Sequence, residues 1–449
     1  MQETICALST PSAMGAIAVI RVSGSKALAV VQSVFRAFHV CPFHPRVAYY
    51  GEITDGETVL DEVLCTYFQS PHSFTGEDMV EISCHGSLYV QKRLLELLIE
   101  RGCRSAMPGE FTRRAFLNGR MDLSQAEAVA DVIASQCRSA NKLAVNALKG
   151  GVSSKIKQLR DQLLHFAAML ELELDFSEED VEFANRQQLL QLLFEISSQI
   201  HTLSDSFSQG NAIREGIPVA IVGKPNVGKS TLLNTLLQDD RAIVSDTPGT
   251  TRDTVEEKLA IGGYLFRIID TAGIRQSADD IEVFGIQRAK KAIQNADIVL
   301  FLTDAASVQE QEQDYSSVFE GSSLEGKHVI KIVNKSDLLP SAAQTDAQAL
   351  YISAKHAVNI ALLQQQLLTI AQSYEKNQDV VLSNVRHYQA LLKAEQHLRQ
   401  AVEAMQSGAF TDCIAIDIRQ VLYHLDEVIG EVTNNDILKE IFSRFCIGK

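Results

Sequence analysis

Proline is missing from two long stretches of this chain, residues 109–217 and 341–449. Because proline breaks the interior of a helix, such stretches can form long uninterrupted helices. Apolar residues recur in them at helical spacing, for example Leu159, Leu163, Phe166, Leu170 and Leu174. We therefore expect two or more long helices in 119–210 and again in 384–445, and we expect the two stretches to pack on each other.

The rest of the chain divides into two further regions. Residues 217–375 alternate short β-branched strands with helices, which is typical of a doubly wound parallel sheet. Residues 1–118 mix short strands (15–22, 47–53, 63–68 and 79–84) with turns and a helix near 87–101, which predicts an α+β unit. A length of 449 residues suggests about three domains. We expect multidomain α/β architecture: an α+β domain at 1–118, a discontinuous helical domain at 119–214 and 379–449, and an inserted domain at 215–378.

Composition excludes several classes of protein. The net charge of −15 excludes a uniformly basic surface for nucleic acid. No apolar run approaches the ~18 residues that cross a bilayer. The first twenty residues contain no Lys or Arg, so we expect no signal peptide. Seven carboxylates fall within residues 171–182, and their alternation with Leu and Phe favours a solvated helix face over a metal site. We expect a soluble, cytoplasmic protein without a membrane anchor.

The strongest motif follows the expected strand 219–222. Residues 223–230 read GKPNVGKS and lead into an expected helix at 231–238, which is a P-loop in its strand–loop–helix context. Gly223 and Gly228 let backbone N–H groups turn toward phosphates. Lys229 supplies a positive charge for the β- and γ-phosphates, and the Ser230 hydroxyl is a ligand for Mg²⁺. The segment predicts binding of a nucleoside triphosphate.

Two motifs at the ends of later strands specify the nucleotide. The expected strand 264–269 ends in DTAG at 270–273, where the Asp can hold Mg²⁺ and the Gly N–H can meet the γ-phosphate. The expected strand 329–333 ends in NKSD, and Asp337 can accept hydrogen bonds from both N1–H and the exocyclic amine of guanine. Adenine lacks that pair of donors, and Ser353-Ala354-Lys355 would support the base. We therefore predict a Ras-like P-loop domain that binds GTP.

The residues expected to drive hydrolysis depart from those of Ras. Ile274 stands where Ras carries its water-orienting Gln, and an isoleucine has no group that orients water. The segment 249–253 (GTTRD) supplies Thr251 as a second Mg²⁺ ligand. Asn226 offers an oxygen near the α- and β-phosphates, where a monovalent cation would neutralise the charge that an arginine finger neutralises elsewhere. Other candidates for orienting water are Arg275, Asp279, Asp280 and Glu282.

Together these features resemble the tRNA-modification GTPase family MnmE (also called TrmE), among the TrmE-Era-Septin-like GTPases. The resemblance rests on the inserted GTPase, GTTRD, the hydrophobic residue after DTAG and the C-terminal FCIGK at 445–449. The segments 73–78 (SFTGED), 108–112 (PGEFT) and 114–118 (RAFLN) also match family motifs, so the resemblance covers the whole chain. CIGK is not a prenylation box, because its third residue is Gly and its last is Lys.

The resemblance implies a particular activity and assembly. It implies an N-terminal folate-binding domain through which two copies dimerise, with the GTPase inserted in the helical domain. With the FAD-dependent partner MnmG (GidA), in a heterotetramer or larger complex, such a homodimer adds an aminomethyl-type (carboxymethylaminomethyl) group at C5 of the wobble uridine of certain tRNAs. The implied carbon source is a tetrahydrofolate derivative, 5,10-methylene- or 5-formyl-tetrahydrofolate.

The resemblance also implies roles by position. Glu282 would position the attacking water, Ser230 and Thr251 would bind Mg²⁺, and Cys446 would take part in the chemistry or be a small buried hydrophobic side chain. The implied K⁺ ligands are Asn226, Ser245, Thr247 and Thr250. The implied folate contacts are Arg21, Glu81, Arg120 and Lys449. The nucleotide contacts are Asn226, Val227, Gly228, Lys229, Ser230, Thr231, Ser245, Asp246, Thr247, Pro248, Gly249, Thr250, Thr251, Asp270, Thr271, Ala272, Gly273, Asn334, Lys335, Asp337, Ser353, Ala354 and Lys355.

Two alternative functions stay open from the sequence. The first is a ribosome-assembly GTPase of the Era-like type; such proteins usually carry a basic RNA-binding module, and this chain has no strongly basic domain. The second is a folate-dependent one-carbon transferase whose GTPase is only regulatory. The sequence leaves open whether the aminoalkyl donor is glycine, ammonium or taurine, and which tRNAs are modified.

Overall fold

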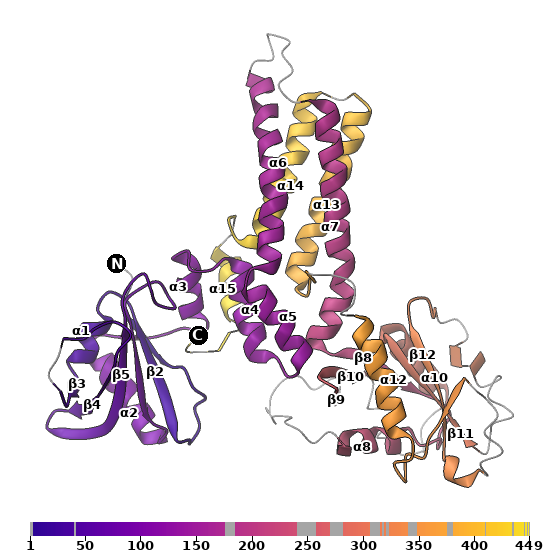
Figure 1. Ribbon diagram of the computed structural model, residues 1–449, viewed down its shortest axis with the longest axis horizontal. Helices are drawn as coiled ribbons and strands as arrows, with labels where there is room; N and C mark the ends of the chain where they lie inside the picture. The colour runs from indigo at the N-terminus through magenta and orange to yellow at the C-terminus, as the bar shows by residue number, and fades with distance from the viewer. Residues whose placement is uncertain are drawn as a thin grey trace. The chain divides into compact units, whose positions relative to one another are not determined.

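The structure is a computed structural model (Figure 1). It describes residues 3–39, 42–175, 185–239, 257–269, 282–305, 315–316, 318–319, 323–339, 348–374, 380–408, 410–432, 435–443, 445–446 and 448. The chain folds into two compact units. The first comprises Met1–Ile133, Asn146–Leu193 and Gln396–Lys449, and the second comprises Ala134–Val145 and Phe194–Glu395. The domain boundaries given above stay a prediction.

The first unit contains a seven-stranded sheet in the order β3-β4-β5-β6-β2-β1-β7. Its strands are β1 (Ile5–Leu8), β2 (Ile17–Ser23), β3 (Phe35–Ala37), β4 (Ala48–Asp55), β5 (Thr58–Phe68), β6 (Met79–His85) and β7 (Arg104–Ser105). Neighbours run antiparallel except β1 and β7, which run parallel. Helices α1 (Ala27–Gln32) and α2 (Leu88–Glu100) share a buried core with the sheet. The expected α+β fold is confirmed.

The same unit contains helices from both proline-free stretches. They are α3 (Glu110–Leu117), α4 (Leu123–Ala134), α6 (Gly151–Asp175), α14 (Thr411–Ile429) and α15 (Asn435–Ser443). Ion pairs join α6 to α14 at Arg160–Asp426 and Arg419–Glu171, so these two helices run antiparallel (Figure 1). The predicted packing of one helical stretch on the other is confirmed, because residues more than two hundred positions apart meet along one seam.

The second unit is built on a six-stranded sheet in the order β13-β12-β11-β8-β10-β9. Its strands are β8 (Ile217–Val222), β9 (Glu257–Ile261), β10 (Tyr264–Ile269), β11 (Ile298–Asp304), β12 (His328–Asn334) and β13 (Ala349–Tyr351). All neighbours are parallel except β9 and β10. Helices α8 (Lys229–Asp239), α10 (Glu282–Asn295) and α12 (Ile360–Ser373) belong to this domain. The buried strand residues divide into two apolar clusters. A doubly wound sheet requires this, because both of its faces are covered.

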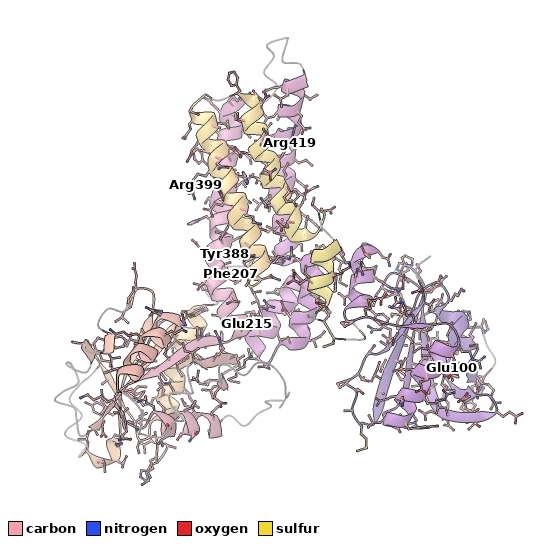
Figure 2. The ribbon with its side chains drawn as sticks, turned by 180° about the vertical axis from the view of Figure 1, so that it is seen from behind. Glu100, Phe207, Glu215, Tyr388, Arg399 and Arg419 are labelled. Carbon is pink, nitrogen blue, oxygen red and sulfur yellow. The ribbon has the colours of Figure 1, made fainter. Side chains whose placement is uncertain are left out.

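Helices α5 (Arg138–Leu148), α7 (Arg186–Glu215) and α13 (Val385–Gln406) contain residues of both units, and so does α4, whose last residue, Ala134, belongs to the second unit. Within the second unit, the segment returning from α12 is fixed to α7. The Leu382 N–H donates to Ser206 Oγ over 3.0 Å, and a Cβ on Gly210 would lie 2.2 Å from the Leu382 carbonyl oxygen. The rings of Phe207 and Tyr388 stack 4.3 Å apart (Figure 2). The segments that enter and leave the α/β domain are therefore held together. Within the described residues, no helix combines the length and apolar character needed to cross a membrane.

Candidate functional site

The glycine-rich loop lies at the carboxyl end of β8. Gly223 and Gly228 have φ of +152° and +99°, a region that disfavours side chains. A Cβ on Gly223 would lie 2.2 Å from the Leu302 carbonyl oxygen, and a Cβ on Gly228 would lie 2.2 Å from Nδ2 of Asn334. Close backbone approach therefore requires glycine at both positions. Glycine at these positions allows the tight turn in which backbone N–H groups can face a phosphate.

Lys229 opens helix α8, and its ammonium group bends back over the loop. The Nζ atom donates to the carbonyl oxygens of Gly223 and Lys224, each over 2.8 Å. Burial lowers the pKa of this ammonium group from its usual value. Phosphate oxygens would give the same ammonium group charged acceptors in place of neutral carbonyl oxygens. Hydrogen bonds to charged acceptors are stronger.

Asn334 connects the phosphate loop to the segment expected to hold the base. Its Nδ2 donates to the Val227 carbonyl oxygen over 2.8 Å, and its Oδ1 accepts from the Ala354 N–H over 3.0 Å. The side chain is buried, so both bonds are shielded from water. Asn334 and Val227 are more than one hundred positions apart in the sequence. The parallel sheet brings them together, because the ends of β8 and β12 lie at one edge.

Asp337 follows β12 within a short 3₁₀ turn (Ser336–Leu338). The buried Ser353 hydroxyl donates to its Oδ1 over 2.6 Å, which lowers the pKa of the carboxyl group. The second oxygen, Oδ2, lies 3.9 Å from Nε2 of His356, and about a third of the side chain is exposed. Asp337 is thus an ionised acceptor that a ligand can reach. Lys335 has φ of +61° and pairs with Asp304 of β11.

Several expected site residues lie outside the described residues. The backbone of Glu282 begins α10, but its side chain is not among those described. Thr231 and Ser230 lie exposed in the first turn of α8, Val227 is buried, and Lys355 is exposed beside Ala354. The residues outside the description are Ser245, Asp246, Thr247, Pro248, Gly249, Thr250, Thr251, Asp270, Thr271, Ala272, Gly273 and Lys449, and the candidates Ile274, Arg275, Asp279 and Asp280.

A second candidate site lies in the first unit, around Arg21. Arg21 on β2 and Glu81 on β6 are cross-strand partners, with Nη2 and Nε donating to Oε1 over 2.6 and 3.0 Å. The Arg21 guanidinium carbon lies 5.2 Å from the ring centre of Phe74 and 5.7 Å from that of Phe111. The sequence motifs contained both aromatic residues but gave neither a role. They hold the guanidinium group in a partly apolar environment, where its polar interactions are stronger.

The C-terminal segment reaches this pair. The Gly448 carbonyl oxygen accepts from Ser9 Oγ over 3.1 Å and from Arg21 Nη1 over 3.5 Å. A Cβ on Gly448, whose φ is +94°, would lie 2.1 Å from the Leu8 carbonyl oxygen, so only glycine fits. Cys446 is exposed, and therefore the alternative of a buried hydrophobic side chain is wrong. Arg120 is exposed, and its Cγ lies 3.1 Å from the position that a Cβ on Gly76 would take.

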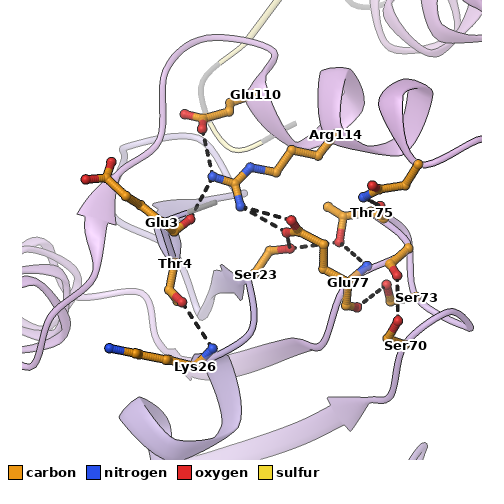
Figure 3. Close-up of polar contacts among 12 residues, drawn as sticks. Glu3, Thr4, Ser23, Lys26, Ser70, Ser73, Thr75, Glu77, Glu110 and Arg114 are labelled. Atoms are coloured by element: carbon orange, nitrogen blue, oxygen red, sulfur yellow. Dashed lines mark hydrogen bonds and ion pairs between the residues drawn. The ribbon is translucent and has the colours of Figure 1, made fainter. Parts of the chain in front are cut away.

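A network of charged side chains supports the neighbouring strands (Figure 3). Arg114 on α3 is buried, and it donates to Glu77 Oε2 and to Glu110 Oε1, each over 3.0 Å. Ser23, two residues from Arg21, donates to Glu77 over 2.8 Å. Burial raises the pKa of Glu110, but hydrogen bonds from Arg104, the Met107 N–H and Arg114 outweigh it and lower that pKa to about 2. The motifs at 73–78, 108–112 and 114–118 therefore contribute to one network of buried and half-buried polar side chains close to Arg21.

The fold and the first site define the class of protein. A glycine loop joins a buried parallel strand to α8, and Asp337 with Ser353 lies at the same sheet edge. The class is a Ras-like P-loop GTPase, inserted between two helical segments behind an N-terminal α+β region.

Comparison with known proteins specifies the family. The descriptions "MnmE helical domain" and "GTP-binding protein TrmE N-terminus" match residues 123–446 and 4–120. Proteins named tRNA modification GTPase MnmE are 47% identical over 468 residues in Porphyromonas gingivalis (100% of this chain, 98% of the relative) and 47% over 452 residues in Cytophaga hutchinsonii (100% and 98%). The Christiangramia forsetii protein of that name is 46% identical over 474 residues, with both chains fully covered. This chain belongs to the MnmE family of tRNA modification GTPases.

Among solved structures, a variant of Aquifex aeolicus Era bound to GDP and AlF4⁻ matches with 28% identity and a TM-score of 0.27. The match covers 40% of this chain and 65% of the Era chain. The assignment of the family rests on the full-length relatives.

Proposed function

We propose that this protein is a potassium-dependent GTPase that acts with a FAD-dependent partner of the MnmG type on the wobble uridine of certain tRNAs. The product is a uridine with an aminomethyl-type (carboxymethylaminomethyl) group at C5. The observation that carries the proposal is the full-length similarity to proteins named tRNA modification GTPase MnmE, at 47% identity. The chain would work in the cytoplasm as a homodimer.

The geometry of the P-loop supports a role for K⁺. Asn226 has φ of +63°, a left-handed conformation that asparagine tolerates better than most residues, and it lies exposed in the loop. The Asn334 side chain holds the adjoining Val227 carbonyl group. The backbone that carries the Asn226 side chain is therefore held in place. The proposed cation would place positive charge beside the phosphates, with Mg²⁺ at Ser230 and Thr251, and Glu282 would position water.

The residues around Arg21 fit a folate. Glu81 is a carboxylate at the sheet surface, and a carboxylate can accept two N–H groups of the kind that a pterin ring presents. Phe74 and Phe111 provide apolar contact, and the C-terminal segment brings Cys446 within the same region through Gly109, whose N–H donates to the Cys446 carbonyl oxygen over 3.4 Å. The bound tetrahydrofolate derivative would supply a one-carbon unit, and Arg120 and Lys449 are proposed as further contacts.

A folate-binding measurement tests this second site with a matched control. Arg21→Gln removes a guanidinium group that is 15% exposed and joins Glu81, so we expect binding of 5-formyl-tetrahydrofolate to weaken at least tenfold in equilibrium dialysis. Arg36→Gln removes another cross-strand Arg–Glu pair of the same sheet, Arg36–Glu52, where the arginine is 70% exposed. The control should bind like the unmutated protein. Equal binding by both variants contradicts the assignment of Arg21.

The outer face of the first sheet supports homodimerisation. Tyr50, Leu64, Ser83 and Val19 form one cross-strand row on it, and Tyr50 and Leu64 are about half exposed. A second copy of the chain would remove this apolar surface from water.

The acidic chain is expected to bind tRNA with positive surface supplied by the flavoprotein partner.

The experiment that tests the whole function is nucleoside analysis of tRNA from a deletion strain complemented with variants. The unmutated gene should restore the C5 wobble modification. Glu282→Ala should bind GTP, lose most turnover and fail to restore the modification, whereas Cys446→Ser should hydrolyse GTP normally with less modified tRNA. Normal modification in the deletion strain contradicts the proposal and favours a ribosome-assembly GTPase. Full modification by Glu282→Ala without turnover would favour a regulatory GTPase.

A further inference from the structure

The peptide group of Ala354 is held from both sides by different elements. Its N–H donates to Asn334 Oδ1 at the end of β12 over 3.0 Å. Its carbonyl oxygen accepts from the Thr235 hydroxyl on α8 over 2.8 Å. Ala354 is 2% exposed, so water has little access to its amide. Ala354 lies between Ser353, which orients Asp337, and Lys355, which the sequence assigns to the base. Thr235 is therefore joined to the base-binding segment.

Thr235 lies on helix α8, which begins at the end of the phosphate loop. Helix α8 begins at Lys229, and six residues of α-helix span roughly 9 Å. The N-terminal end of this helix faces the phosphate loop, and the Thr235 hydroxyl reaches the base-binding segment. A second oxygen, the Thr231 carbonyl four residues earlier, lies 2.9 Å from the same hydroxyl. The single hydroxyl proton is shared between a bond within the helix and a bond across to Ala354.

We propose that Thr235 is a positioning residue that sets the separation between the phosphate loop and the guanine-binding segment. The inference rests on the proposed function only in that a guanine nucleotide is the ligand. A guanosine nucleotide must satisfy both ends at once, so a shift of Ala354 away from α8 loosens the base while the phosphates stay bound. The Thr235 hydroxyl bonds to the Ala354 carbonyl oxygen, and its effect on the base passes through Ala354.

Removal of the hydroxyl gives a specific expectation. Thr235→Val keeps the shape of the side chain and leaves the buried Ala354 carbonyl oxygen without its donor. We expect the Kd of GDP and the KM of GTP to rise by about tenfold, which is the effect of one unsatisfied buried acceptor. The kcat should stay unchanged, because the bonds that the structure gives the Thr235 hydroxyl are to the carbonyl oxygens of Thr231 and Ala354. Thr235→Ser retains a hydroxyl and should restore most of the affinity.

Thr369 on α12 provides a matched control. Its hydroxyl also donates to a carbonyl oxygen four residues earlier, Gln365 O, over 2.8 Å, and its side chain is exposed. Thr369→Val therefore makes the same change to a helix without removing a bond to the base-binding segment. We expect GDP affinity to equal that of the unmutated protein. Inhibition by tripolyphosphate, which has no base, should be the same in Thr235→Val as in the unmutated protein.

The measurements are titrations of full-length protein with a fluorescent GDP and steady-state GTP hydrolysis in KCl. Unchanged Kd and KM for Thr235→Val overturn the inference, as does an equal weakening of tripolyphosphate, which would mean that the phosphate loop itself was damaged. Lost affinity in Thr369→Val overturns it too, because helix α8 would then have no special part. Failure of the unmutated protein to bind GDP contradicts the proposed function, and the inference with it.

Discussion

Glu110 permits a quantitative prediction, because its protonation is coupled to the fold. Hydrogen bonds from Arg104, Arg114 and the Met107 N–H lower its pKa from 4.5 to about 2. The difference of about 2.5 pKa units corresponds to about 3 kcal/mol at 1.36 kcal/mol per unit. Its side chain is only 12% exposed, so solvent screens little of this. The unfolded chain holds the proton more tightly than the folded one, so this stabilisation is present above pH 4.5 and is lost as pH falls toward 2.

We therefore expect Glu110→Gln to lower the free energy of unfolding of this sheet by about 3 kcal/mol at pH 7 and by progressively less below pH 4.5. Urea-dependent pulse proteolysis at pH 7, 5, 4 and 3, with peptides from residues 3–118 quantified by mass spectrometry, measures this region of the full-length protein. The control is Glu96→Gln, which removes a 45%-exposed carboxylate paired with Arg93 on the surface of α2. That change should cost less than about 1 kcal/mol at every pH.

Two outcomes would refute this reasoning. A cost of Glu110→Gln below about 1 kcal/mol at pH 7 would mean that desolvation cancels the two arginine contacts. A cost that does not shrink between pH 5 and pH 3 would mean that the carboxylate charge is not what Arg104 and Arg114 stabilise. Either result would mean that the network in Figure 3 stabilises the fold through packing and not through charge.

Two further predictions concern the nucleotide site. Asp337→Asn replaces an acceptor, whose pKa is lowered by the Ser353 hydroxyl, with a group that presents N–H to guanine; preference should shift from GTP toward XTP in a filter-binding titration, and unchanged GTP affinity would contradict the base assignment. If Asn226 binds K⁺, hydrolysis should be much faster in KCl than in NaCl at equal ionic strength, and Asn226→Ala should abolish that difference while GDP binding persists. Equal rates in both salts for the unmutated protein would exclude the cation.

The sequence predicted long and strongly patterned elements well, and short ones poorly. Absence of proline and regular apolar spacing were enough for the long helices, and runs of β-branched residues were enough for β8 and β12. Strands β1, β3 and β7 were not predicted, because they have four, three and two residues and show no measurable period. They form because neighbouring strands supply their hydrogen-bond partners.

Charge patterns were less informative than apolar ones. Residues 171–182 were predicted to be a solvated helix face; residues 176–182 lie outside the described residues, and Glu171 is exposed. Glu173 is buried, however, and pairs with Arg186 of α7 over 2.6 Å, so the prediction is wrong there. A buried carboxylate needs a partner, and the return of the chain through α7 provides Arg186.

The nucleotide site could be predicted from sequence because each of its parts is local. A P-loop requires a strand, two glycines, a lysine and a helix within about a dozen consecutive residues, and the backbone conformation that binds phosphate follows from them. The identity of the base likewise follows from Asp337 within a tetrapeptide. By contrast, the contacts that hold the phosphate loop and the base-binding segment together join residues that are distant in sequence. Asn334 with Val227 and Thr235 with Ala354 are two such pairs.

The meeting of Arg21, Glu81 and Gly448 was decided by tertiary structure alone. Arg21 and Gly448 are 427 positions apart, and the sequence placed Arg21 and the neighbouring Lys449 near one site only through a family resemblance. No local pattern encodes such a contact, because it forms only when the antiparallel register of β2 and β6 pairs Arg21 with Glu81 and the last helix returns the chain end to β1. The residues of a local loop are joined by covalent geometry, whereas these are joined only by the packing of the elements that carry them.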